Sequence, residues 1–149
     1  MIEITISLNK ETVLEEVSQT TSYVGSKSGD GDTYDDTFTS DEDSSMLERF
    51  WNESKNTACN VLKRFLTEEV EEVGNYRIKL RMSESFDKNL KDSIQRSLFS
   101  FFVCNIVSKW YNMINKGEAT NYASEAVSHL ENVRMKVLHK KKPIRPQYN

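Results

Sequence analysis

Acidic side chains gather in one short stretch of the chain. Seven carboxylates and a single lysine lie between residues 26 and 45, and the acidic residues are Asp30, Asp32, Asp35, Asp36, Asp41, Glu42 and Asp43. Closely spaced carboxylates can bind calcium, but an EF-hand loop that starts at Asp30 needs glycine at its sixth position and glutamate at its twelfth. Those positions hold Asp35 and Asp41. The sequence therefore favours a mobile, solvated acidic contact loop over a metal site.

Basic side chains gather at two places in the second half of the chain. Arg77, Lys79 and Arg81 alternate with apolar residues in YRIKLRM, so they share one face of a predicted strand. The C-terminal basic tail, residues 140–149, includes Lys140, Lys141, Lys142, Pro143, Ile144, Arg145, Pro146, Gln147 and Tyr148. Both places could bind the phosphates of nucleic acid, although a sequence pI of about 5.5 argues against it. The alternative is a solvated strand face and a tail whose lysine stems lie along apolar surface.

Residues with nucleophilic or acid–base chemistry are few and dispersed. Cys59 and Cys104 lack CxxC spacing, and we expect them to be free thiols on buried helix faces. Glu125 and His129 have the spacing of an ordinary helix-surface pair, and HExxH, GxSxG and glycine-rich phosphate-loop motifs are absent from the sequence. The sequence therefore predicts a protein that is not an enzyme and needs no cofactor.

The small net charge of this chain hides two halves of opposite sign. The 149 residues favour a single domain, residues 1–139, followed by the basic tail. Residues 1–75 carry 17 acids and 6 bases, a net charge of -11, whereas residues 76–149 carry 6 acids and 14 bases, a net charge of +8. Opposite charges at the two ends of a chain suit head-to-tail contacts, which close into rings where the rotation permits.

The apolar segments indicate a protein without a membrane span. The longest near-apolar run, LFSFFVCNIV at residues 98–107, is about half of the ~20 residues that a spanning helix needs. The N-terminus MIEITISLNK alternates in polarity and differs from a signal peptide. We therefore expect a buried core helix at residues 98–107 and assembly in the cytoplasm.

Two strands and four helices must position these residues. Residues 2–8 and 76–82 alternate with period two and predict strands that pair with each other or with the sheet edge of a neighbouring subunit. Asn9 is expected to cap a helix over about residues 10–24. A capping box of Ser45 and Glu48 predicts a second, long helix that runs to Gly74.

The last two helices are predicted to form an αα-hairpin. They cover about residues 87–115 and 119–139, with a tight turn at residues 116–118. Trp110 and Tyr111 have apolar neighbours, which indicates a place in the core. The expected fold is mainly α, a helical bundle with this αα-hairpin and a small two-stranded β element.

The helix pair SIQRSLFSFFVCNIVSKWYNMI and ASEAVSHLENVRMKVL, with the acidic loop and the tail KKKPIRPQYN, resembles a phage head–tail connector, also called a neck or adaptor protein. The resemblance covers about residues 43–149. Such adaptors form rings, commonly of about twelve copies, below the portal protein. The resemblance implies that Lys140 to Tyr148 contact the portal and that residues 26–45 contact a further neck or tail protein.

Three functions follow from the sequence, and the first rests on this resemblance. The first function is that of a virion neck component, which forms a homo-oligomeric ring between portal and tail and assembles in the cytoplasm of the bacterial host. The second is an oligomeric helical interaction or regulatory protein of a bacterium or mobile element. The third is a nucleic-acid-binding accessory protein that uses the basic strand and tail. The strand YRIKLRM departs from an all-helical adaptor, so a tail-completion role stays open.

Overall fold

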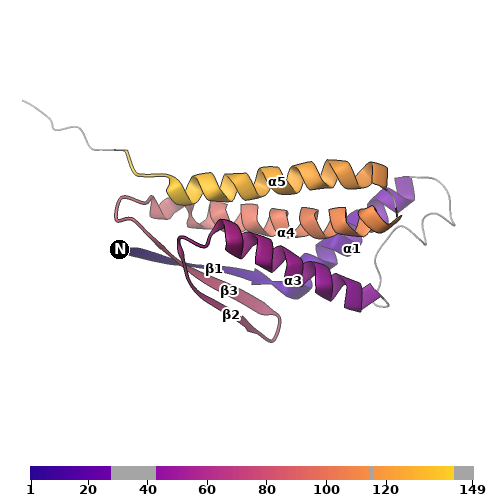
Figure 1. Ribbon diagram of the computed structural model, residues 1–149, viewed down its shortest axis with the longest axis horizontal. Helices are drawn as coiled ribbons and strands as arrows, with labels where there is room; N and C mark the ends of the chain where they lie inside the picture. Colours follow the sequence, from indigo (N-terminus) through magenta and orange to yellow (C-terminus); the bar gives the residue numbers. More distant parts are fainter. Residues whose placement is uncertain (28–42, 115, 143–149) are drawn as a thin grey trace, which may run out of the picture.

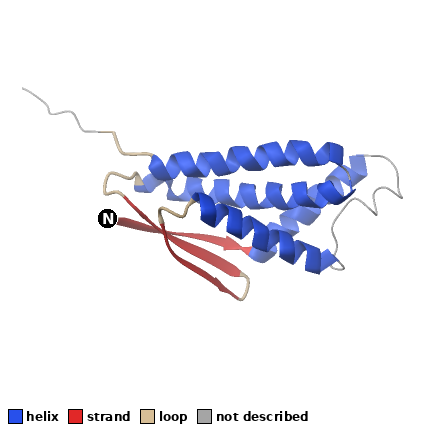
Figure 2. Cartoon of the chain, in the orientation of Figure 1, coloured by secondary structure: helices blue, strands red, loops and turns tan. Residues whose placement is uncertain are grey.

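The computed structural model describes residues 1–27, 43–114 and 116–142, without the side chains of residues 23–27. Four helices lie along one side of a three-stranded sheet (Figures 1 and 2). The elements in chain order are β1 (Ile2–Asn9), α1 (Lys10–Lys27), α3 (Ser44–Val61), β2 (Leu66–Glu72), β3 (Asn75–Met82), the short 3-10 helix η2 (Lys88–Leu90), α4 (Lys91–Ile114) and α5 (Lys116–Leu138). The prediction of a mainly α fold with a small β element is confirmed.

The sheet is antiparallel, with strand order β1-β3-β2. β1 and β3 pair within the chain, with Ile6 opposite Ile78, as one of the two sequence alternatives predicted. The apolar sides of β1 and β3 are buried under the helices, because successive side chains of a strand point to opposite faces. The sequence analysis missed the third strand, β2, which pairs with the other edge of β3.

The long helix predicted from Ser45 to Gly74 is wrong in its second half. The helix α3 ends at Val61, and Leu66–Glu72 form β2. Val73 and Gly74 both have positive φ, 47° and 81°, which is the backbone of a two-residue type I′ hairpin turn. Gly74 therefore reverses the chain between two strands and does not end a helix. β1 pairs with one edge of β3, and this hairpin supplies the strand that pairs with the other edge.

Two smaller predictions about helix ends are also wrong. Ser45 lies inside α3, and Asp43 occupies the N-cap position without a side-chain cap, so the capping box of Ser45 and Glu48 does not form. Residues 116–118, predicted as a turn, are the first turn of α5. The cap at Asn9 is confirmed, because its Oδ1 accepts a hydrogen bond from the Thr12 N–H at 3.0 Å.

The helix α4 lies at the centre of the molecule and packs against α5, α1, α3 and β1. Its apolar segment is buried nearly all round, as the run at residues 98–107 predicted. The ring of Phe102 meets those of Trp51 at 5.0 Å and Tyr76 at 6.0 Å, which joins α4 to α3 and to the sheet. Trp110 and Tyr111 are buried, and this confirms their predicted place in the core.

The arrangement gives the molecule two distinct ends. In Figure 1 the described chain ends beside its N-terminus, whereas α3 starts at the opposite end, where α4 passes into α5. The two ends of α5 are ~34 Å apart, since 23 helical residues rise about 1.5 Å each. Within the described ranges, no helix is long and apolar enough to span a membrane.

Candidate interaction surfaces

The outer sheet face carries the three basic residues of β3. Arg77, Lys79 and Arg81 are exposed side by side on it, as the alternation predicted. Each has a carboxylate partner on a neighbouring strand, in the pairs Arg77–Glu72 (3.5 Å), Lys79–Glu68 (2.9 Å) and Arg81–Glu3 (3.4 Å). Three cations therefore face three carboxylates, and their formal charges cancel.

This pairing changes what the outer sheet face can bind. The hydrogen bond and charge of Glu68 raise the pKa of Lys79, so the Lys79 ammonium stays protonated at neutral pH. A shallow hollow of about 240 Å³ opens on the face beside Arg77 and Lys79, and Glu68 also lines it. A polyanion would meet as many carboxylates as cations there, so the face lacks the net positive charge on which phosphate binding depends. The basic strand alone is a weak nucleic-acid site.

The start of the basic tail is fixed to the folded domain. The Lys141 N–H donates to the Ser85 carbonyl at 2.7 Å, and Lys140 forms a β-bridge with Phe86, whose side chain is buried. Lys140, Lys141 and Lys142 are exposed. The structure thus fixes the first residues of the tail on the folded domain. The other residues assigned to the tail, Pro143 to Tyr148, lie outside the described residues.

The acidic loop predicted at residues 26–45 falls mostly outside the described part of the chain. The assigned contact residues Asp30, Asp32, Asp35, Asp36, Asp41 and Glu42 lie there. Asp43 is described, at the N-terminal end of α3 and partly buried. Within the described ranges, no group of three His, Cys, Asp or Glu side chains is arranged to hold a metal ion.

A polar cluster that the sequence analysis missed joins α3 to β2. The Trp51 indole N–H donates to Glu71 at 3.1 Å, and the Lys55 ammonium pairs with the same carboxylate. Burial raises the pKa of Glu71, but the hydrogen bonds from Lys55 and Trp51 outweigh it and the net pKa is lowered. The sequence predicts residues 66–72 as helix, and that prediction does not bring Glu71 beside Trp51.

The second half of this cluster contains a cysteine. The Cys59 thiol donates to Glu69 at 2.6 Å, and the Tyr76 hydroxyl donates to the same carboxylate at 2.7 Å. Burial raises the pKa of Cys59 to about 11 and also raises that of Tyr76. A protonated thiol is a poor nucleophile, so these contacts hold β2 against α3 and offer no activated group. Cys59 and Cys104 are free, as predicted, but half-buried where the prediction had them buried.

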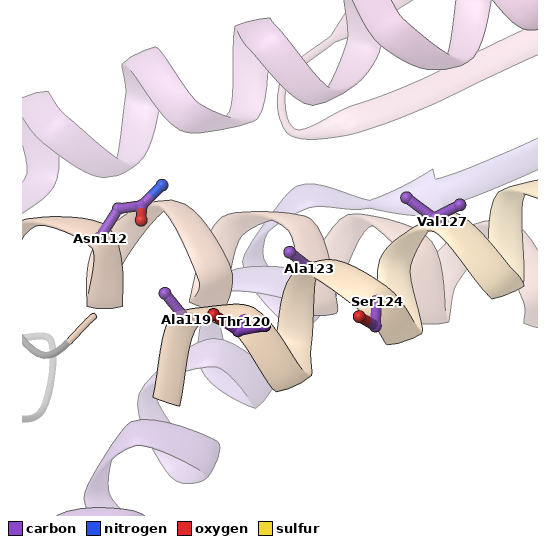
Figure 3. A pocket seen from close by; sticks show the side chains of 6 residues that line it. All are labelled: Asn112, Ala119, Thr120, Ala123, Ser124 and Val127. Carbon is purple, nitrogen blue, oxygen red and sulfur yellow. The ribbon is translucent and has the colours of Figure 1, made fainter. Parts of the chain in front are cut away.

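A shallow groove of about 480 Å³ runs along the start of α5 (Figure 3). Asn112 of α4 and small side chains of α5 line it, namely Ala119, Thr120, Ala123, Ser124 and Val127. These six residues offer hydroxyls and one amide and carry no charge. Nothing in the groove favours one ligand class over another.

A second groove, of about 430 Å³, lies between the first turns of α1 and α3. We call it the acidic groove, and it is lined by Glu11, Leu14, Glu15, Ser18, Ser44, Leu47 and Glu48. The i, i+3 and i+4 spacing of these residues places each set on one helix face. Sequence periodicity could have grouped each set, but it could not show that the two faces meet.

Comparison of this chain with protein families, with curated proteins and with solved structures finds no match.

Proposed function

We propose that this chain is a non-catalytic structural component of a phage neck, a head–tail adaptor that forms a ring between the portal and the tail. The observation that carries the proposal is the fixed start of the basic tail. Lys140 and Lys141, the first two residues of the tail, are held against Phe86 and Ser85. A charged segment presented from a fixed point is suited to docking on another protein.

The distribution of charge in the fold supports assembly through contacts between unlike surfaces. Exposed lysines begin the tail at one end of the molecule, whereas the acidic groove lies toward the other (Figure 1). Contacts between two different surfaces of identical subunits are heterologous, and they close into a ring where the rotation permits. A ring adaptor needs such a surface pair.

The polar groups of the described residues give less support to the other functions. The basic strand face is neutralised by Glu3, Glu68 and Glu72, which weakens the nucleic-acid hypothesis. The cysteine of the polar cluster has a raised pKa and acts as a hydrogen-bond donor. A regulatory interaction protein would also need exposed contact surfaces, but no particular observation favours that function over the adaptor.

Native mass spectrometry of the full-length chain, alone and mixed with the portal protein of the same genome, tests the proposal. We expect a complex with the portal that contains many copies of the 17.3 kDa chain. Assembly can depend on the portal, so a monomeric species in its absence is compatible with an adaptor. A chain that stays monomeric and unbound in the presence of an assembled portal would contradict the proposal. Contact between the tail and the portal, which the family resemblance implies, is a separate prediction.

A further inference from the structure

The acidic groove combines an apolar floor with a carboxylate rim. Leu14 of α1 and the buried Leu47 of α3 form the floor, and three glutamates stand around them. Its volume of about 430 Å³ falls within the ~300–1,000 Å³ of ordinary binding clefts. A ligand that fits must therefore bring cations and at least one apolar side chain.

Two of the rim carboxylates have no cation of their own within the described residues. Glu48 pairs with Lys10, but neither Glu11 nor Glu15 forms an ion pair with any described side chain. Glu11 lies in the first turn of α1, where a carboxylate also stabilises the helix end. Glu15 lies one turn further along, where that effect has faded, so helix stability does not explain its place.

The basic tail has the composition that the acidic groove requires. It carries Lys140, Lys141, Lys142 and Arg145, and Ile144 lies between two prolines. Prolines favour an extended backbone with little conformational entropy to lose on binding. The segment that joins α1 to α3, residues 28–42, has six acids and no base, so its charge does not match the groove.

The fold separates the tail from the groove of its own copy. The described chain ends at the far end of α5 from the start of α3, so a returning tail would have to cover most of the ~34 Å length of α5 (Figure 1). Seven residues follow Lys142, and fully extended they span at most ~24 Å. A neighbouring molecule is a better acceptor than the same one.

We infer that the acidic groove between α1 and α3 binds the basic tail of a second copy of this chain. Ile144 occupies the floor of Leu14 and Leu47, and the tail cations face Glu11 and Glu15. This contact is heterologous, so repetition around a closed ring gives every groove one tail. The inference rests on the proposed function insofar as that function makes the tail a contact segment, and it assigns the tail to the next subunit of the ring instead of the portal.

A labelled peptide of residues 138–149 tests this assignment directly. Its fluorescence anisotropy is measured while the full-length chain is added at about 50 mM salt, where exposed charges are weakly screened. We expect saturable binding that weakens as salt is raised. Glu15→Lys should weaken it about tenfold or more, because the substitution reverses a charge at the rim. An Ile144→Asp peptide should lose affinity by a similar factor, because a charge would enter the apolar floor.

The chain offers a closely matched control. Glu16 is the next residue of α1, is exposed and does not line the groove, so Glu16→Lys should change the affinity less than about twofold. Circular dichroism verifies that both variants are folded. Equal affinities for Glu15→Lys and Glu16→Lys, or no binding at all, would overturn the inference.

The same peptide separates this inference from the proposed function. Binding of the peptide to the purified portal and not to this chain would overturn the tail–groove contact and leave the adaptor function standing. Peptide binding by the groove, together with a chain that never joins a portal, would support the tail–groove contact and overturn the adaptor function.

Discussion

At the scale of single residues, side-chain chemistry here holds elements together. Glu71 accepts a hydrogen bond from Trp51 and pairs with Lys55, so one β2 carboxylate fixes two side chains of α3. Glu69 accepts hydrogen bonds from Cys59 of α3 and Tyr76 of β3, and so joins β2 to both elements. These two carboxylates explain why an acidic strand, LTEEVEE, is stable at a sheet edge against a helix.

The lowered pKa of Glu71 predicts a pH dependence of stability. Its pKa in the folded chain lies below the unfolded value of about 4.5, so the carboxylate stabilises the fold above that pH, and the contribution is lost as pH falls through the folded value. Glu71→Gln should lower the free energy of unfolding at pH 7 by about 1–2 kcal/mol. It should also flatten the loss of stability below about pH 4.5, as measured by urea denaturation. Parallel pH profiles for the variant and the parent chain would contradict this account.

The raised pKa of Cys59 predicts a slow thiol. In a Cys104→Ser background, alkylation by iodoacetamide at pH 8 should be about a hundredfold slower than for an unperturbed thiol, because the thiolate fraction falls with the shift from 9.0 to about 11. Unfolding in guanidinium should restore the ordinary rate. A native rate equal to the unfolded one would show that Glu69 and Tyr76 do not shield the thiol.

At the level of helices and strands, the sequence predicts the segments with clear apolar periodicity correctly. It fails at residues 62–75, where it predicts a continuing helix and the structure has a strand and a hairpin turn. β1, β3, α4 and α5 follow from their apolar periodicity. β2 does not follow from periodicity, because Glu69 and Glu71 face the helix side. The strand therefore lacks the alternation of apolar and polar residues that marks β1 and β3. The turn signal was ambiguous too, since one glycine suits either a helix end or a hairpin. Among the interaction surfaces, the start of the tail was predictable, but the salt bridges on the outer sheet face and the acidic groove were not, because they depend on β2 and on how α1 meets α3.

The hairpin turn gives a direct test of this element. Val73 has φ of 47° and is fully exposed, so its β-branched side chain bears the strain of a left-handed backbone without any packing in return. Val73→Asn creates Asn-Gly, the preferred type I′ pair, and should stabilise the fold by about 1 kcal/mol, seen as a higher melting temperature. Thr57→Asn, at an exposed position inside α3, is the control and should be neutral or destabilising. A lower melting temperature for Val73→Asn would contradict the hairpin.

Across the whole molecule, the charged residues behind the asymmetry of the sequence lie on several separate surfaces. The outer sheet face is balanced within itself, so its three cations do not add to a basic half. The acidic groove and the start of the tail remain as surfaces of opposite charge near opposite ends of the fold (Figure 1). Such a polarity suits head-to-tail assembly, and it is the physical basis of the proposed adaptor function.

Removal of residues 143–149 separates assembly from folding. The truncation keeps the contacts of Lys140 and Lys141 with the domain, so the melting temperature should change by less than about 2 °C. Association between copies should be lost, as followed by analytical ultracentrifugation at low salt. A truncated chain that still assembles like the full-length chain would show that the tail is not the contact segment.

Native mass spectrometry of the full-length chain with an assembled portal is the sharpest test of the proposed ring-forming adaptor function. We expect a complex in which the portal carries a closed set of copies of this chain, each of 17.3 kDa. A portal that binds no copies, beside a chain that remains monomeric, would contradict it.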